Sequence, residues 1–427
     1  MESAGAGAAA LTSFYIGIDV GTSGCRAIAI DNTNHIVGKS AVTLPASYVK
    51  AGHIVQNPHD WWLACHLVLD DLLAQIPRKH VKSIAVDGTS GTVLLCDADG
   101  TLQSDAYMYN DNNNQVAAKR IEQIAPRESA VHGTSSGLAK CLTLIDKYQP
   151  AKTTKCLNQA DWIAGIFTQK YHFSDQNNSL KLGYDPVQQC WPEWMQALKC
   201  QDYLAENVCQ PGDIFAPMAP PMANTFKLPE TTKIIAGTTD SIAAFIATGC
   251  KQTGEAVTSL GSTLAIKLLT DHPIYAPEYG VYSHRLADKW LVGGASNTGG
   301  TVIKKYFDSA QISALSRKLD IKHATGLDYY PLLEVGERFP VNDNEFAPKL
   351  NPRPTSELLF FQGILEGIAN IEKNGYKKLA QLGASYPTIV LTTGGGSINP
   401  AWQEMREQIL QVPVRKAKFT EAAYGAA

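Results

Sequence analysis

Glycine and hydroxyl residues crowd a short turn near the start of the chain, between two apolar runs. The stretch Asp19-Val-Gly-Thr-Ser-Gly24 has β-branched residues on both sides, which predicts a strand, a turn and a second strand. Because Gly21, Thr22 and Ser23 leave backbone N–H groups and two hydroxyls uncovered, the turn is suited to hold a phosphate. Asp19 adds one carboxylate, and Mg²⁺ accepts one or two protein carboxylates while keeping several waters. An ordinary hairpin with a glycine turn also fits these residues.

Two further candidate residues lie in polar loops of the same half of the chain. Val81–Val86 is predicted to be a buried strand that ends in Asp87-Gly-Thr-Ser-Gly-Thr92, and ligands in open α/β sheets bind beyond the carboxyl ends of strands. Ser90 is therefore a candidate contact for a substrate hydroxyl, with a simple turn serine as the competing interpretation. Asp111, in an Asn/Asp-rich run, is a candidate contact in the wall of a polar cleft.

A third acidic candidate stands between a strand and a helix. Lys233–Ala236 is predicted to be a strand, Gly237-Thr-Thr-Asp240 the loop at its carboxyl end, and Ser241–Ala247 the start of a helix. As the N-cap, Asp240 would stabilise the helix by about 1 kcal/mol. As a catalytic group, it would point into the cleft. Taken alone, these residues favour the cap and leave the catalytic role open.

The strand–turn–strand pattern occurs again in the second half. Glu255–Leu260 and Leu264–Leu269 are predicted strands around the turn Gly261-Ser-Thr263, and Trp290–Val292 is a third strand. Each half thus begins with a meander whose glycine–hydroxyl turn suits a phosphate. We expect two similar domains that face each other across a cleft.

A glycine-rich loop follows a later strand. Thr388–Leu391 is predicted to be a strand, Gly394-Gly-Gly396 lies just beyond it, and Asn399 opens a helix that reaches Leu410. Glycines let a ligand approach the backbone closely, and a helix N-terminus carries partial positive charge. A merely flexible loop is the alternative.

The bulk composition limits the class of protein. A chain of 427 residues with 44% hydrophobic and 18% charged residues is expected to fold into two domains. A net charge of −3 without a long basic run argues against nucleic acid or a membrane surface as the main partner. The nine cysteines stand singly, without the spacing of a zinc site, and predict a cytoplasmic protein with reduced thiols. The composition predicts no oligomeric state.

Five of these motifs, in this order, resemble those of the FGGY carbohydrate kinases, which belong to the actin-like ATPase superfamily. The resemblance covers nearly the whole chain from Phe14 onward, and the loop Asp87-Gly-Thr-Ser-Gly91 looks most like that of small D-ribulokinase-type members. The matching motifs are Asp19-Val-Gly-Thr-Ser23, Gly237-Thr-Thr-Asp240, Gly261-Ser-Thr263, Gly394-Gly-Gly396 with Asn399, and Glu421-Ala-Ala423.

The resemblance implies an α/β fold of two ribonuclease-H-like domains, each a mixed sheet with helices, facing across a cleft. It implies a sugar-binding and catalytic domain over residues 14–249 and a nucleotide-binding domain over residues 250–427. The Ala/Gly-rich residues 1–13 are expected to form a disordered leader outside the fold.

The resemblance also assigns roles to the candidates and reverses the interpretation of Asp240, which aligns with the catalytic base. Asp19 would orient the sugar or a metal-bound water, and Asp240, Ser90 and Asp111 would contact the sugar. The arginine of the family pattern after Asp111 is missing from Tyr109-Asn-Asp-Asn-Asn113, which weakens that assignment. The phosphates would be held by Gly21, Thr22, Ser23, Gly261, Ser262 and Thr263, and the adenine by Gly395, Gly396, Asn399 and Trp402.

The implied function is the ATP- and Mg²⁺-dependent phosphorylation of the terminal hydroxyl of a small-molecule sugar, a pentulose, with D-ribulose as first choice. D-xylulose, another ketose or a polyol are alternative substrates. A non-catalytic actin-like sugar sensor is an alternative of a different class. A dinucleotide enzyme finds no support, because no Gly-x-Gly-x-x-Gly motif opens a helix after the first strand.

Overall fold

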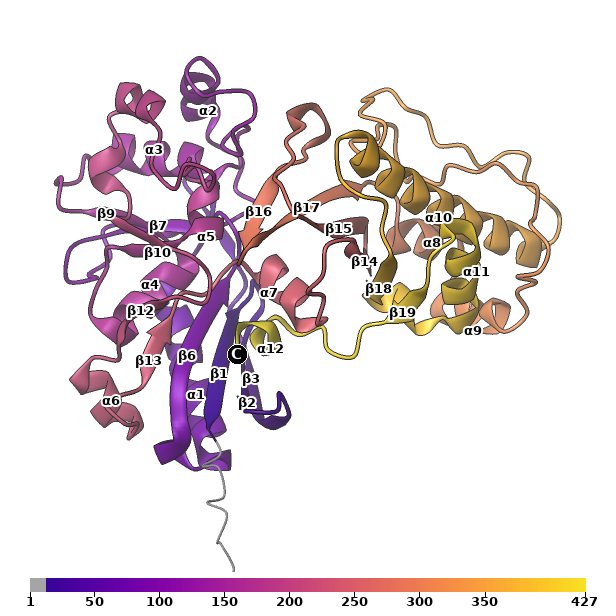
Figure 1. Cartoon of the computed structure of the whole chain (residues 1–427). Helices are drawn as coiled ribbons and strands as arrows, with labels where there is room; N and C mark the ends of the chain where they lie inside the picture. The colour runs from indigo at the N-terminus through magenta and orange to yellow at the C-terminus, as the bar shows by residue number, and fades with distance from the viewer. Residues whose placement is uncertain (1–12) are drawn as a thin grey trace, which may run out of the picture. The chain divides into compact units, whose positions relative to one another are not determined.

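The computed structural model describes residues 13–427, which divide into two units of α/β structure (Figure 1). Unit 1 contains the described residues up to 125 together with 131–247 and 421–427, and unit 2 contains 126–130 and 248–420. The predicted leader, apart from Ser13, lies outside the described residues.

The main sheet of unit 1 has the order β12-β13-β6-β1-β2-β3. The first three strands in the chain form an antiparallel meander, and β6 and β13 then pair in parallel on the other side of β1. The strands are β1 Phe14–Val20, β2 Gly24–Asp31, β3 Ile36–Thr43, β6 Val81–Gly88, β12 Ile214–Pro217 and β13 Lys233–Ile235.

A smaller sheet of unit 1 has the order β4-β5-β8-β7-β9, and β10 pairs with β11. These strands are β4 Tyr48–Lys50, β5 His53–Gln56, β7 Val93–Cys96, β8 Ala106–Tyr107, β9 Lys155–Asn158, β10 Phe173–Asp175 and β11 Asn207–Cys209. The helices of the unit are α1 Pro58–Gln75, α2 Gln115–Glu122, α3 Gly137–Tyr148, α4 Gln159–Thr168, α5 Gln176–Leu180, α6 Pro220–Phe226, α7 Asp240–Ala247 and α12 Ala422–Ala426.

Helix α1 shows how local sequence builds this unit. The Asn57 side chain caps it by accepting a hydrogen bond from the His59 N–H, and Pro58 occupies the first turn, where no backbone donor is needed. Its buried face, which includes Trp61 and Leu72, packs against β2 and β3. This packing holds the strands around the first glycine turn in place.

The end of the chain returns to unit 1, where α12 packs on β1 and α7 (Figure 1). Two glycines make this close approach possible. A Cβ atom on Gly17 would lie 2.0 Å from the carbonyl oxygen of Ala423, and one on Gly425 would lie 1.8 Å from that of Ala243. The terminal helix therefore packs backbone to backbone on the strand that carries Asp19.

The sheet of unit 2 has the order β16-β17-β15-β14-β18-β19. Its strands are β14 Glu255–Leu260, β15 Leu264–Thr270, β16 Ser283–Leu286, β17 Lys289–Ser296, β18 Ile389–Thr393 and β19 Val414–Lys416. Its helices are α8 Gly300–Tyr306, α9 Ser309–Ser316, α10 Glu357–Gln381 and α11 Pro400–Leu410.

The two units repeat one topology. In unit 1 the order β3-β2-β1-β6-β13 combines an antiparallel meander with two parallel strands, and in unit 2 the order β17-β15-β14-β18-β19 does the same. This finding confirms the predicted α/β fold of two similar mixed-sheet domains. It also places the carboxyl ends of the parallel strands of each unit at one edge of its sheet.

A fully buried ion pair ties the helices of unit 2 to its sheet. Arg406 of α11 donates from Nε and Nη2 to the two carboxylate oxygens of Glu372 of α10, each at 2.7 Å. Its Nη1 donates to Thr392 Oγ1 of β18 at 2.8 Å, and Thr258 Oγ1 of β14 donates to Glu372 at 2.5 Å. The pair thereby fixes both helices on the strands that lead to the Gly261 turn and to the glycine loop.

We predict that Arg406→Met lowers the free energy of unfolding of unit 2 by about 3–5 kcal/mol, because it leaves the Glu372 carboxylate buried without its cation. Adding Glu372→Leu should restore most of that loss. Urea denaturation of the two variants and the wild type measures both effects. A single variant as stable as the wild type, or a double variant no better than the single, would contradict this account.

Candidate active site

Three aspartates lie side by side at the carboxyl ends of the parallel strands of unit 1. Asp19, the penultimate residue of β1, is the register partner of Asp87 in β6. The next residue, Gly88, forms a bridge with Thr239, which precedes Asp240. Because β1, β6 and β13 are neighbours, residues from three distant parts of the chain meet at the edge where open α/β sheets bind ligands.

Asp87 is the buried member of this group, and no local sequence pattern marks it. It is fully buried, and neither carboxyl oxygen receives a hydrogen bond from an N–H or hydroxyl group within residues 13–427. Burial raises the pKa of Asp87 well above the usual carboxyl range, and the charges of Asp19 and Asp240 raise it further. The side-chain hydrogen bond between Asp19 and Asp87 also raises the pKa of Asp87 and lowers that of Asp19.

Asp19 is the more readily ionised partner. Arg26, its register partner in β2, places Nη1 3.2 Å from Asp19 Oδ2. Burial raises the pKa of Asp19, while the hydrogen bond with Asp87 and the charge of Arg26 lower it. Arg26 is a site residue that the sequence did not reveal, because the strand pattern does not show which side chain faces the aspartate.

Asp240 is half-buried at the first position of α7. The carbonyl of Thr239 accepts hydrogen bonds from the N–H groups of Ile242 and Ala243, both at 2.9 Å, so Thr239 occupies the N-cap position. Asp240 Oδ1 instead accepts from its neighbour Ser241 N at 2.6 Å. Asp240 is thus the first residue of α7, one position after the N-cap, and it lies at the sheet edge close enough for its charge to affect Asp87.

The first glycine turn is held through its carbonyl groups. The N–H of Gly21 closes the turn on Gly24 O at 3.0 Å, and Leu44 N donates to Ser23 O at 2.9 Å. Buried Gln56 donates to Thr22 O at 3.1 Å. These contacts leave the Thr22 side chain partly exposed and the Ser23 side chain exposed, while the Gly21 N–H is already used within the turn.

Ser90 and Asp111, the two other candidates of unit 1, differ in their surroundings. The Ser90 hydroxyl is buried and has no hydrogen-bond partner within the described residues. Buried hydroxyls are usually hydrogen-bonded, so a ligand could supply the missing partner. Asp111 is buried and fully engaged: Oδ1 accepts from Ile54 N at 2.8 Å, and Oδ2 contacts His53 Nδ1 at 3.1 Å and Asn114 Nδ2 at 2.8 Å. Asp111 therefore holds its own loop against β5, which carries His53 and Ile54. Nothing in its surroundings supports the predicted contact with the sugar.

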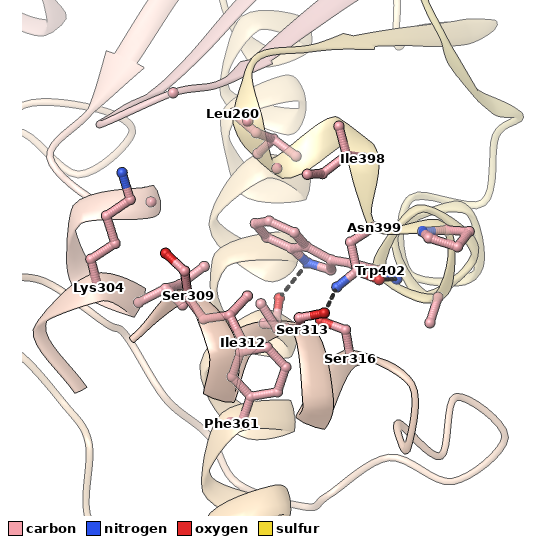
Figure 2. A pocket seen from close by; sticks show the side chains of 18 of the residues that line it. Leu260, Lys304, Ser309, Ile312, Ser313, Ser316, Phe361, Ile398, Asn399 and Trp402 are labelled. Carbon is pink, nitrogen blue, oxygen red and sulfur yellow. Dashed lines mark hydrogen bonds between the residues drawn. The ribbon is translucent and has the colours of Figure 1, made fainter. Parts of the chain in front are cut away.

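Unit 2 contains a cavity of about 770 Å³, within the range of small-molecule sites. Figure 2 shows Trp402 facing apolar side chains of α9 and α10 across it, with Lys304 of α8 at one side. Of the residues predicted to bind nucleotide, those that line this cavity are Gly261, Ser262, Gly395, Gly396, Asn399 and Trp402. Thr263 is not among the lining residues, and the Gly21 turn belongs to unit 1.

The wall formed by α11 is fixed by its own hydrogen bonds. Asn399 Oδ1 caps α11 by accepting from Trp402 N at 3.1 Å, and its Nδ2 donates to Ser316 Oγ at 2.9 Å. Buried Trp402 donates from Nε1 to Leu365 O at 3.1 Å (Figure 2). Both side chains thus shape the cavity rather than offer free polar groups to it.

Helix α9 is the wall that the sequence analysis missed. Its residues Ser309, Ile312, Ser313 and Ser316 line the cavity. The signal was present, since the Asp308 side chain accepts from Gln311 N while the Gln311 side chain accepts from Asp308 N. This reciprocal pair is a capping box, which marks a helix start in a sequence.

Comparison with known proteins decides the family. The model of the N-terminal domain of the FGGY family of carbohydrate kinases matches residues 14–247, and that of its C-terminal domain matches residues 256–427. The chain belongs to the FGGY family of carbohydrate kinases. It is an enzyme of that class, with the two-domain fold of the actin-like ATPases.

Related proteins match over nearly the full length. Xylulose kinase of Bacillus subtilis is 24% identical, over 97% of this chain and 87% of its own. Gluconokinase of the same organism is 21% identical, over 95% and 84%. The crystal structure of xylulose kinase from Rhodospirillum rubrum superposes with a TM-score of 0.83 at 20% identity, over 97% of this chain and 88% of that one.

Two features are absent from residues 13–427. No helix in this range is long and apolar enough to span a bilayer. No group of three or more His, Cys, Asp or Glu side chains in the same range is arranged to hold a metal ion.

The glycine loop beside the cavity offers a matched pair of substitutions. A Cβ on Gly396 would lie 2.7 Å from both Leu260 Cβ and Trp402 Cζ3, whereas a Cβ on Gly395 would meet nothing within 4 Å. We predict that Gly396→Ala lowers the melting temperature, because the floor and wall of the cavity must shift.

Gly395→Ala should leave the melting temperature unchanged but weaken nucleotide binding, because its methyl group enters the cavity. Differential scanning fluorimetry with and without ATP measures both effects. Equal melting temperatures for the two variants, or unchanged ATP binding by Gly395→Ala, would contradict the assignment of this cavity.

Proposed function

We propose that this carbohydrate kinase transfers the γ-phosphoryl group of ATP to the terminal hydroxyl of a pentulose, with D-ribulose as the first candidate and D-xylulose as the second. The observation that carries the proposal is the group of three aspartates at the carboxyl ends of the parallel strands of unit 1. Asp87 is fully buried and its pKa is raised, whereas Asp240 is half-buried at the same sheet edge.

Asp240 is proposed as the base that receives the proton of the attacking hydroxyl. A carboxylate is a weak base at neutral pH. This weakness is acceptable because phosphoryl transfer passes through a loose transition state, in which positioning and charge stabilisation supply most of the catalysis. General base catalysis by a positioned side chain contributes about 10²–10⁴-fold.

The nucleotide is proposed to occupy the cavity of unit 2. Its base would lie between the apolar side chains of α9 and α10 and Trp402, and its phosphates would lie toward the Gly261 turn. Backbone N–H groups of such turns favour anions. The turn at Gly21, Thr22 and Ser23 is proposed to bind phosphate as well.

Asp19 fits a role in binding Mg²⁺. Mg²⁺ in kinases is held by one or two carboxylates, several waters and the phosphates of the substrate, so it needs no preformed cluster of three protein ligands. When bound, the ion supplies positive charge to the β- and γ-phosphates. Asp19 and its neighbour Arg26 would orient the groups around it.

The charge of the site supports a neutral sugar over a sugar acid. The related proteins include both xylulose kinases and gluconokinases. Gluconate carries a carboxylate, which the negative charges of Asp19 and Asp240 would repel. A pentulose carries no charge, and its hydroxyls can use the buried, unpartnered oxygen of Ser90.

A substrate panel tests the proposal. D-ribulose, D-xylulose, L-ribulose, glycerol and D-gluconate are incubated with MgATP, and sugar-dependent formation of ADP is measured. We expect turnover with a pentulose, D-ribulose above D-xylulose, and little with gluconate. Preference for gluconate would overturn the substrate class, and sugar binding without any ADP would support a sensor instead.

We predict that Asp240→Asn lowers kcat by at least about 10²-fold while the KM for ATP changes little, because the variant loses the base but keeps the cavity of unit 2. Steady-state kinetics and ATP titration measure the two effects. Asp70→Asn on the exposed face of α1 is the matched control and should behave as the wild type. Near-full turnover by Asp240→Asn would show that another group takes the proton.

A further inference from the structure

A buried lysine lies below the loops of unit 1 that carry the candidate sugar contacts. Lys140 of α3 is completely buried. Its ammonium donates to three backbone carbonyls, those of Gly91 at 2.8 Å, Ser135 at 2.8 Å and Tyr109 at 3.1 Å. An ammonium group has three hydrogens to donate, so each one is used.

The three carbonyls belong to three separate segments. Gly91 follows Ser90 in the loop after β6, Tyr109 lies in the Asn/Asp-rich run, and Ser135 precedes the capping residue of α3. Thr92 also links the loop after β6 to the Asn/Asp-rich run, because its Oγ1 accepts a hydrogen bond from Tyr109 N at 2.9 Å. We call the place where the three segments meet the junction. Lys140 is thus the point at which these segments are joined.

Burying the Lys140 ammonium costs free energy of desolvation, which is unfavourable for a residue that serves stability alone. No carboxylate forms a hydrogen bond or ion pair with the Lys140 ammonium within the described residues. The pKa of Lys140 is lowered to about 7, chiefly by burial and then by the charge of Lys181, while the charge of Asp111 opposes the shift. An apolar side chain would avoid this desolvation cost, but it could not fix three carbonyl groups.

The junction determines the position of Ser90. Gly91 has a left-handed φ of 79°, and its carbonyl is held by Lys140. On the other side of Ser90, Thr89 is held by Gln159, whose Oε1 accepts from Thr89 N at 2.9 Å and Thr89 Oγ1 at 2.8 Å. Ser90 therefore stands between two anchored residues, with its own hydroxyl buried and unpartnered.

We propose that Lys140 is a positioning residue for the sugar: it anchors the loop after β6 so that the Ser90 hydroxyl faces the substrate, and it thereby sets the KM for the sugar. The assignment rests on the proposed sugar kinase function and deepens it. Lys140 touches no reacting atom and acts through Ser90.

The test compares Lys140→Met, Ser90→Ala and the double variant by steady-state kinetics with D-ribulose and ATP. Lys140→Met should raise the KM for the sugar about tenfold, which corresponds to about 1.4 kcal/mol, with kcat within about threefold and the KM for ATP unchanged. Ser90→Ala should raise the sugar KM similarly, and the double variant should be no worse than the worse single variant, because both act on one contact.

Lys147→Met is the matched control, because Lys147 lies on the same helix and its ammonium contacts the Tyr107 hydroxyl rather than a loop carbonyl. It should leave both KM values unchanged. Additive effects of Lys140→Met and Ser90→Ala, or an equal rise in the KM for ATP, would overturn the proposal. Should Lys140→Met fail to fold, Lys140→Arg replaces it, and it should show a smaller rise in sugar KM with the same lack of additivity.

Hydrogen exchange separates this proposal from the proposed function. Lys140→Met should speed amide exchange in residues 88–92 relative to the wild type, and Lys147→Met should not. If the wild type phosphorylates no pentulose, the proposed function fails, while faster exchange would still support the anchoring role. Unchanged exchange in residues 88–92 would overturn the role of Lys140 whichever substrate the enzyme uses.

Discussion

The main constraint on unit 1 is the electrostatic repulsion among three aspartates at one edge of its main sheet. Asp19, Asp87 and Asp240 follow from neighbouring parallel strands, and three ionised carboxylates at such short range would repel one another strongly. Full burial of Asp87 reduces this repulsion, because desolvation raises its pKa and disfavours its charged form. Arg26 offsets the charge of Asp19. Asp240 is half-buried, so it is the most accessible of the three aspartates.

The two units apply one topology to different chemistry. Both begin with an antiparallel hairpin around a glycine–hydroxyl turn and continue with parallel strands. In unit 1 those strands end in carboxyl groups, whereas in unit 2 β18 leads into glycines, and apolar side chains from α9, α10 and α11 enclose a cavity. The repeated backbone thus supplies a glycine–hydroxyl turn twice, while the residues at the strand ends differ between the two units.

Local patterns predicted the hairpins, the repeat and the position of Asp240 at a helix start, because each depends on residues close in sequence. Asp87 was not predicted, since its importance arises only when β6 lies between β1 and β13. The polar run around Asp111 suggested a ligand contact, but a run of polar residues does not show which donors will face it. Helix α5 was not predicted, because it is short and its Asn177 and Asn178 are buried in a hydrogen-bond network, so it lacks the usual hydrophobic periodicity.

In the proposed reaction, a terminal sugar hydroxyl attacks the γ-phosphate of ATP and loses its proton to Asp240. The most direct test is ³¹P NMR of the reaction of MgATP with D-ribulose carrying carbon-13 at its terminal C5. The account predicts a phosphate ester signal split by coupling to that carbon. Release of inorganic phosphate alone, or an ester without this coupling, would contradict it.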